Sequence, residues 1–136
     1  RNGLTPVFCI GETLEERKAN LTNSVLERQL KNGLMGFTKE EASGVIIAYE
    51  PVWAIGTGVV ATPEQAEETM KYIRQFLVGL YDYDLAESIR ILYGGSIKPD
   101  NFDSLVAMED IDGGLVGGAS LLESFVQLVA IAKNHE

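Results

Sequence analysis

Short apolar runs alternate along the chain with segments that suit helices. The runs are residues 7–10 (Val-Phe-Cys-Ile), 45–49 (Val-Ile-Ile-Ala-Tyr), 91–93 (Ile-Leu-Tyr) and the pair 115–116 (Leu-Val). Each ends in polar or glycine-rich residues, as strands of βα units do. We therefore predict an α/β fold with four parallel strands at these positions, each buried on both faces.

Capping boxes mark where the predicted helices begin. In this motif a Ser or Thr stands three residues before a Glu or Gln, and the two side chains satisfy free backbone N–H groups. The strongest helix follows Thr62, with Pro63 in its first turn and apolar residues at helical spacing up to Leu80. A helical turn from Leu14 and a helix over residues 22–33 are also expected. The boxes are Thr13 with Glu16, Thr38 with Glu41, Thr62 with Gln65, and Ser120 with Glu123.

No linker or low-complexity stretch divides the 136 residues, so we expect one domain or part of one. The chain opens on Arg1-Asn2-Gly3, which is typical of the closing turn of a helix that ends in a left-handed glycine. We therefore expect the sequence to be a piece of a longer protein.

Composition narrows the choice of partners. A net charge of −9 argues against nucleic acid, whose phosphates need a basic surface. The longest clean apolar stretch, residues 128–132, is too short to cross a membrane. One cysteine (Cys9) and one histidine (His135) exclude an internal disulfide and a Cys/His zinc site, so no metal is expected. We expect Cys9 to be a buried structural thiol and the location to be cytoplasmic.

The most informative motif is residues 48–58 (Ala-Tyr-Glu-Pro-Val-Trp-Ala-Ile-Gly-Thr-Gly). Glu50 stands at the C-terminal end of a predicted strand, and Pro51 favours extended backbone at Glu50. Trp53, small residues and two glycines follow, which suits a loop that moves as one unit between two positions. Taken alone, a glutamate in such a loop is more often a solvated side chain than a catalytic base.

Glycine pairs follow the third and fourth predicted strands, in residues 93–96 (Tyr-Gly-Gly-Ser) and 117–120 (Gly-Gly-Ala-Ser). Paired glycines let backbone N–H groups converge on an anion, and a helix N-terminus adds about half a positive charge. Each pair alone is more often a tight turn, whereas two pairs on consecutive strand ends favour a phosphate site. We expect Glu50, Ser96 and Gly118 to share one cavity.

A second motif points elsewhere. Residues 56–61 (Gly-Thr-Gly-Val-Val-Ala) match the dinucleotide fingerprint G-x-G-x-x-A. However, five residues separate Glu50 from the first glycine, and no acid ends a second strand about twenty residues further on. A nicotinamide oxidoreductase is therefore the weakest alternative. The charged residues 15–18 are expected to be a solvated helical face.

Four motifs, taken in order, resemble the triosephosphate isomerase family. They are residues 9–12 (Cys-Ile-Gly-Glu), 49–58, 93–96 and 115–120, and together they extend over nearly the whole chain. A (β/α)8 TIM barrel takes roughly 250 residues, and four βα units are half of eight. The resemblance implies that residues 1–136 are the C-terminal half of a TIM-barrel domain, a half barrel whose N-terminal half is absent.

The resemblance also implies an activity, the interconversion of dihydroxyacetone phosphate and D-glyceraldehyde 3-phosphate in glycolysis and gluconeogenesis. The reaction transfers a proton through an enediolate and needs no cofactor or metal. Glu50 matches the catalytic base, and residues 51–61 match the lid, for which this family is itself a standard example. The substrate phosphate would lie on the backbone N–H groups of Gly56, Ser96, Gly117 and Gly118.

Further roles implied by the resemblance concern the lid. Its hinges would lie at residues 52–53 and 59–61. Tyr93 and Ser96 would latch the lid when it is closed, while Glu12 and Tyr49 would hold Trp53 when it is open. The moving part would comprise Trp53, Ala54, Ile55, Thr57 and Gly58.

The sequence departs from the family in two respects. The active-site lysine and electrophilic histidine belong to the N-terminal half and have no counterpart here, so the chain alone is expected to be inactive. A non-catalytic phosphate-binding half-barrel module stays open as an alternative. Val59-Val60 replaces the Lys-Thr or Lys-Ser pair common at the second hinge. The parent enzyme is expected to be a homodimer, and this open-edged chain is expected to self-associate or to pair with a complementing half.

Overall fold

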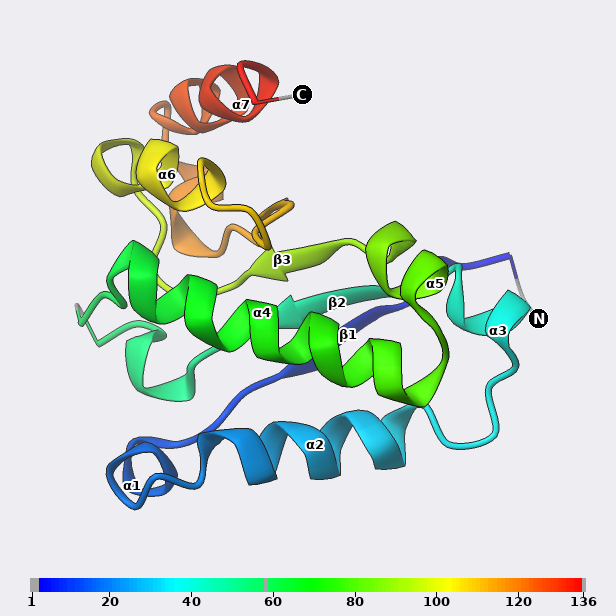
Figure 1. The fold of residues 1–136 in the computed structure, drawn as a ribbon. Coiled ribbons are helices and arrows are strands. Elements are labelled where there is room, and N and C mark those ends of the chain that lie inside the picture. The colour runs from blue at the N-terminus through cyan, green and yellow to red at the C-terminus, as the bar shows by residue number, and fades with distance from the viewer. Residues whose placement is uncertain (1–2, 58, 136) are drawn as a thin grey trace.

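A computed structural model describes residues 3–57 and 59–135. Its four strands form one parallel sheet in the order β1-β2-β3-β4 (Figure 1). The register places Ile10 beside Tyr49 and Tyr49 beside Tyr93. The predicted α/β class is confirmed. The strands are β1 (Val7–Ile10), β2 (Ile46–Tyr49), β3 (Ile91–Tyr93) and β4 (Gly113–Gly114).

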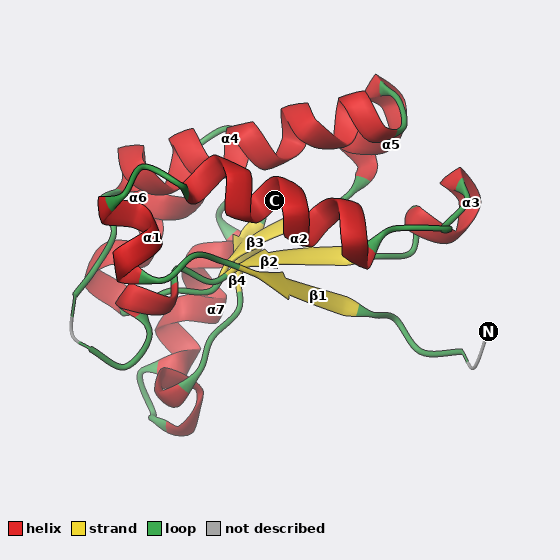
Figure 2. Ribbon diagram, turned by 90° about the horizontal axis from the view of Figure 1, so that it is seen from below, coloured by secondary structure: helices red, strands yellow, loops and turns green. Residues whose placement is uncertain are grey.

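Helices connect successive strands and cover one face of the sheet. Figure 2 shows α2 and α4 lying along that face, and the two helices pack against each other. α6 packs against α7 next to β4. The helices are α1 (Leu14–Lys18), α2 (Thr22–Gly33), α3 (Lys39–Ala42), α4 (Pro63–Leu80), α5 (Tyr83–Ser88), α6 (Pro99–Val106) and α7 (Phe125–Lys133), with 3-10 turns η1 (Val52–Ala54) and η2 (Gly118–Leu121).

Three of the four predicted capping boxes are present. Thr13, Thr38 and Thr62 each accept a backbone hydrogen bond at the start of α1, α3 and α4. The box predicted at Ser120 is wrong. The Ser120 hydroxyl donates instead to the Gly117 carbonyl at 2.7 Å, within η2, and α7 begins only at Phe125.

Two expectations about the strands are also wrong. The fourth strand is Gly113–Gly114, and the predicted pair Leu115 and Val116 follows it. β1 is not buried on both faces, because it is an edge strand. Ile10 belongs to the core, but Val7 and Cys9 are exposed. Cys9 is therefore not a buried thiol.

The core lies between the sheet and its helices. Apolar side chains of α2 and α4 meet those of β2 and β3, and the largest fully buried ones include Leu26, Leu30, Ile47, Met70, Ile73 and Ile91. Within the described ranges, no helix is both long and apolar enough to cross a membrane.

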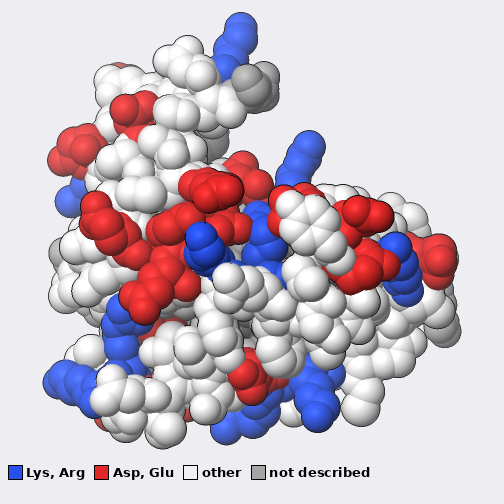
Figure 3. Space-filling model, in the orientation of Figure 1, with Lys and Arg blue, Asp and Glu red and all other residues white. Residues whose placement is uncertain are grey.

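Arg74 of α4 forms a buried polar network at the start of β3. Its guanidinium donates to Asp110 at 2.6 Å and to Asp112 at 2.8 Å, and also to the carbonyls of Ala86 and Ile89. Asp112 in turn accepts the backbone N–H of Ile91 at 2.7 Å. Figure 3 shows acidic side chains, with basic ones among them, gathered over the region of α4. The network ties α4 to the start of β3 and to the segment before β4.

We expect Arg74→Met to lower the free energy of unfolding by about 3–5 kcal/mol, because it leaves Asp110 buried without its partner. Urea unfolding of the chain measures this loss. Lys39→Met is the matched control, since Lys39 and Asp82 form an exposed ion pair whose removal should barely move the midpoint. Equal losses in the two variants would contradict a special contribution from the buried network.

Candidate active site

Backbone hydrogen bonds continue past the ends of the strands and hold the following residues in line. The Glu50 N–H donates to the Ile10 carbonyl at 2.7 Å, and the Gly94 N–H donates to the Tyr49 carbonyl at 2.7 Å. The Leu115 N–H donates to the Tyr93 carbonyl at 2.8 Å. The residues that follow β2, β3 and β4 therefore meet at one edge of the sheet.

One cavity of about 820 Å³ opens at this edge. Glu50, Gly56, Ser96, Gly117 and Gly118 all line it, which confirms that the expected residues share a cavity. Its volume lies in the range typical of small-molecule sites. The other charged residues that line it are Lys98 and Asp100.

Two glycines hold Glu50 between them. A Cβ atom on Gly11 would lie 1.8 Å from the Glu50 carbonyl oxygen, and one on Gly94 would lie 2.5 Å from Glu50 Cγ. The adjoining chains can approach Glu50 this closely only because both positions lack a side chain. The amino-acid pattern indicates no role for Gly11 in the site and, for Gly94, only a role in anion binding.

The structure brings Glu12, Tyr49 and Trp53 together. The Glu12 carboxylate is fully buried. It accepts the Trp53 indole N–H at 2.9 Å and the Tyr49 hydroxyl at 3.1 and 3.2 Å. Burial, reinforced by the Glu12 charge, raises the pKa of Tyr49, so this hydroxyl stays protonated as a donor. The contacts expected for an open lid are present, and their role stays a prediction.

Arg17 completes this cluster, contrary to the expectation of a solvated face. Its guanidinium donates to Glu12 Oε1 at 2.9 Å and also lies 4.8 Å from the centre of the Trp53 ring. One cation thus neutralises the buried carboxylate and stacks on the indole. The sequence does not distinguish Arg17 from its charged neighbours on α1, so its contact with Glu12 could not be predicted.

The segment predicted to be a lid, residues 51–61, has internal hydrogen bonds of its own. The Thr57 hydroxyl donates to the Trp53 carbonyl at 2.7 Å and accepts the Val59 N–H at 3.2 Å. Ala54 is buried, whereas Ile55 and Gly56 line the cavity, and Gly56 has a φ of 65°. Gly58, also predicted to belong to the lid, lies outside the described residues.

Tyr93, which the resemblance assigns to the latch of the closed lid, is buried in the structure. Its hydroxyl has no hydrogen-bond partner in the part of the chain that the structure describes. Burial raises the pKa of Tyr93. A buried hydroxyl without a partner is unusual and calls for an explanation.

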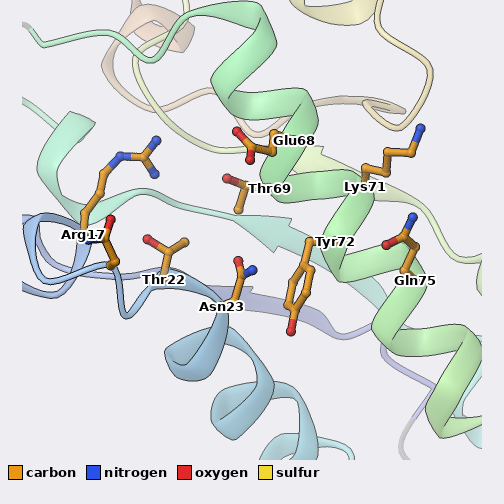
Figure 4. A pocket seen from close by; sticks show the side chains of 9 residues that line it. Arg17, Thr22, Asn23, Glu68, Thr69, Lys71, Tyr72 and Gln75 are labelled. Atoms are coloured by element: carbon orange, nitrogen blue, oxygen red, sulfur yellow. The ribbon is translucent and has the colours of Figure 1, made fainter.

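A second cavity, of about 560 Å³, lies between α2 and α4 (Figure 4). Its prominent polar groups already have partners within the protein. Arg17 binds Glu12, Tyr72 hydrogen-bonds Glu27, and the Thr69 hydroxyl donates to the Gln65 carbonyl. These three groups are therefore already engaged within the protein.

Fold and site together define a class of protein: half of a parallel α/β barrel, with a carboxylate and glycine loops at the C-terminal ends of its strands. The family model for triosephosphate isomerase matches residues 1–132, and the chain belongs to that family.

Curated relatives give the same assignment. The chain is 58% identical over 134 residues to the triosephosphate isomerase of Geotalea uraniireducens, covering 98% of this chain and 53% of the relative. It is 56% identical over 128 residues to that of Carboxydothermus hydrogenoformans, covering 93% and 51%. The chain thus spans about half the length of the curated relatives it matches.

We expect Gly94→Ala to displace the Glu50 side chain, because the new methyl group would overlap Glu50 Cγ. Carbon-13 NMR should show a shift of the Glu50 carboxyl resonance. Gly79→Ala on α4 is the matched control, since a methyl group there meets no atom within 4 Å. An unmoved Glu50 resonance in Gly94→Ala would contradict the close packing described above.

Cys9 offers a chemical probe of Glu50. Although Cys9 is exposed, partial loss of hydration around its thiol and, second, the Glu50 charge raise the pKa of that thiol. Glu50→Gln removes the second cause, so more thiolate forms at a given pH and alkylation by iodoacetamide should quicken at pH 7.5. Glu64→Gln, in the first turn of α4, is the control and should leave the rate unchanged. Equal rates in the two variants would argue against the electrostatic contact.

Proposed function

We propose that this chain supplies the catalytic base and the phosphate-binding loops of an isomerase that interconverts dihydroxyacetone phosphate and D-glyceraldehyde 3-phosphate. The observation that carries this proposal is the single cavity in which the Glu50 carboxylate meets the glycine loops after β3 and β4. Membership of the triosephosphate isomerase family supports the choice of reaction.

Glu50 would act as the base. It removes a proton from the carbon next to the substrate carbonyl and returns it to the neighbouring carbon, by way of an enediolate. General-base catalysis requires the carboxylate within hydrogen-bond reach of that proton. The hydrogen bond from Glu50 to Ile10 and the close approach of Gly11 and Gly94 fix where the residue stands.

Backbone N–H groups would bind the substrate phosphate. The proposed donors belong to Gly56, Ser96, Gly117 and Gly118. A Cβ atom on Gly117 or Gly118 would meet no other atom within 4 Å, so a phosphate can approach this backbone closely. Neutral donors of this kind suit a chain whose net charge is −9, and Lys98 adds one positive charge to the cavity lining.

The lid would exclude water during the reaction. The Glu12 carboxylate, which accepts both the Trp53 indole N–H and the Tyr49 hydroxyl, would hold the lid in its open position. On closing, the Trp53 indole leaves Glu12, and the unpaired Tyr93 hydroxyl with Ser96 receives the lid. Removing water strengthens the electrostatic stabilisation of the enediolate and protects it from side reactions.

The remainder of the active site would come from another polypeptide segment. We propose that residues 1–136 are the C-terminal half of a barrel domain, and that the active-site lysine and histidine belong to the N-terminal half. That half would join both open edges of the sheet, β1 and β4, to close the barrel. The complete enzyme would be a cytoplasmic homodimer, and this chain alone would be inactive.

A joined polypeptide tests this proposal. The N-terminal half of the Geotalea uraniireducens relative is placed before this chain, and isomerisation of D-glyceraldehyde 3-phosphate is measured. We expect activity, and we expect Glu50→Gln to lower kcat by about 10²–10⁴-fold, the range for loss of a general base. Glu64→Gln is the control.

The proposal fails if the joined protein folds and shows no isomerisation. Titration with phosphoglycolate, which imitates the enediolate, then separates the alternative. Binding no tighter than that of inorganic phosphate, and unaffected by Glu50→Gln, would favour a non-catalytic phosphate-binding module.

A further inference from the structure

A single side chain satisfies both backbone groups of Gly11. The Gly11 N–H donates to Gln29 Oε1 at 2.9 Å, and Gln29 Nε2 donates to the Gly11 carbonyl at 3.1 Å. Gln29 lies on α2, 18 residues further along the chain. Its amide thus pairs with Gly11 as an adjacent strand would, through one donor and one acceptor.

Gly11 lies between two residues that bind the Glu50 segment. The carbonyl of Ile10 accepts the Glu50 N–H at 2.7 Å, and the carbonyl of Glu12 accepts the Val52 N–H at 3.1 Å. Residues 10–12 therefore run alongside residues 50–52, which include the proposed base and the first hinge of the lid.

Gly11 is confined on both sides. A Cβ atom there would come within 1.8 Å of the Glu50 carbonyl oxygen, so its backbone already lies against Glu50. The Gln29 amide holds its own N–H and carbonyl. A displacement of Gly11 would therefore displace Glu50 as well.

The amide is not needed to dock α2. Val25, Leu26 and Leu30 of that helix are buried. Gly33 lies so close to the Phe8 ring that a Cβ atom there would be 2.2 Å from it. These apolar contacts hold α2 on the sheet. The hydrogen bonds of the Gln29 side-chain amide go to Gly11.

We propose that Gln29 is a positioning residue, which sets the place of Glu50 and of the first lid hinge through the Gly11 backbone. The inference rests on the proposed function of Glu50 as the base. The Gln29 amide supplies both the donor and the acceptor that Gly11 requires, whereas a glutamate carboxylate offers acceptors alone and methionine lacks both strong groups.

The expected kinetic effect is specific. Gln29→Met should lower kcat by about 10- to 100-fold, because misplacing a catalytic group by about 1 Å costs up to that much. KM should change less than kcat, because three of the four proposed phosphate donors lie on the loops after β3 and β4, which Gln29 does not touch. A smaller folded fraction would also lower the apparent kcat at constant KM, so kcat is calculated per folded molecule, with the folded fraction measured by urea unfolding.

The first test uses the 136-residue chain itself. NMR follows the Glu50 carboxyl carbon, the Trp53 indole and amide exchange at Gly11 in Gln29→Met and Gln29→Glu. We expect Gln29→Met to move the Glu50 resonance and to speed exchange at Gly11. Gln29→Glu keeps an acceptor for the Gly11 N–H and should slow that exchange relative to Gln29→Met. If Gln29→Met does not fold, the Glu50 carboxyl resonance of Gln29→Glu is compared with that of the unsubstituted chain. A difference between the two supports the proposal, and no difference overturns it.

Gln75→Met is the matched control, because Gln75 is exposed on α4. It should leave the Glu50 and Trp53 resonances unchanged. An unmoved Glu50 resonance in a folded Gln29 variant would overturn the proposal, as would a shift of the same size in Gln75→Met.

The second test measures kcat and KM of the joined polypeptide with the same substitutions. A selective fall in kcat supports the positioning role, and an unchanged kcat overturns it. If the joined protein is inactive before any substitution, the proposed function fails, while the Glu50 resonance of the chain still decides whether Gln29 positions that residue.

Discussion

The site depends on parallel pairing that continues beyond the strands. The N–H groups of Glu50, Gly94 and Leu115 each donate to a carbonyl of the neighbouring strand. The loops that follow β2, β3 and β4 therefore begin side by side at one edge of the sheet. Parallel order brings all C-terminal ends to the same edge of the sheet, so residues far apart in sequence line one cavity. Antiparallel pairing would have sent alternate loops to the opposite edge.

Local signals account for the parts of the fold that were predicted. Thr13, Thr38 and Thr62 cap their helices through residues three positions away, so the pattern is readable in the sequence. β4 carries no such signal. It consists of two glycines, and a Cβ atom on Gly114 would lie 2.7 Å from the Ile97 side chain. Neighbouring side chains occupy the space that an apolar strand residue would need. The hydrophobic pattern therefore placed the fourth strand two residues too far along the chain.

The site was predictable where its residues stand at strand ends. Glu50 and the glycine pairs follow apolar runs directly, and their shared cavity follows from parallel order. Gln29 and Arg17 were not predictable in this way, because each looks like an ordinary polar residue on the surface of a helix. Their contacts with Gly11 and Glu12 depend on how α2 and α1 dock on the sheet, which a local pattern does not contain.

In the proposed lid movement, Arg17 would lose its contact with the Trp53 ring but would still neutralise the buried Glu12 carboxylate. When the indole leaves, Glu12 loses one neutral donor but keeps its counter-ion, and the Tyr49 hydroxyl still points at it. No unbalanced charge is then created in the protein interior, where it would cost several kcal/mol. In the proposed lid movement, the two positions of the loop would then lie close enough in free energy for a bound anion to select between them.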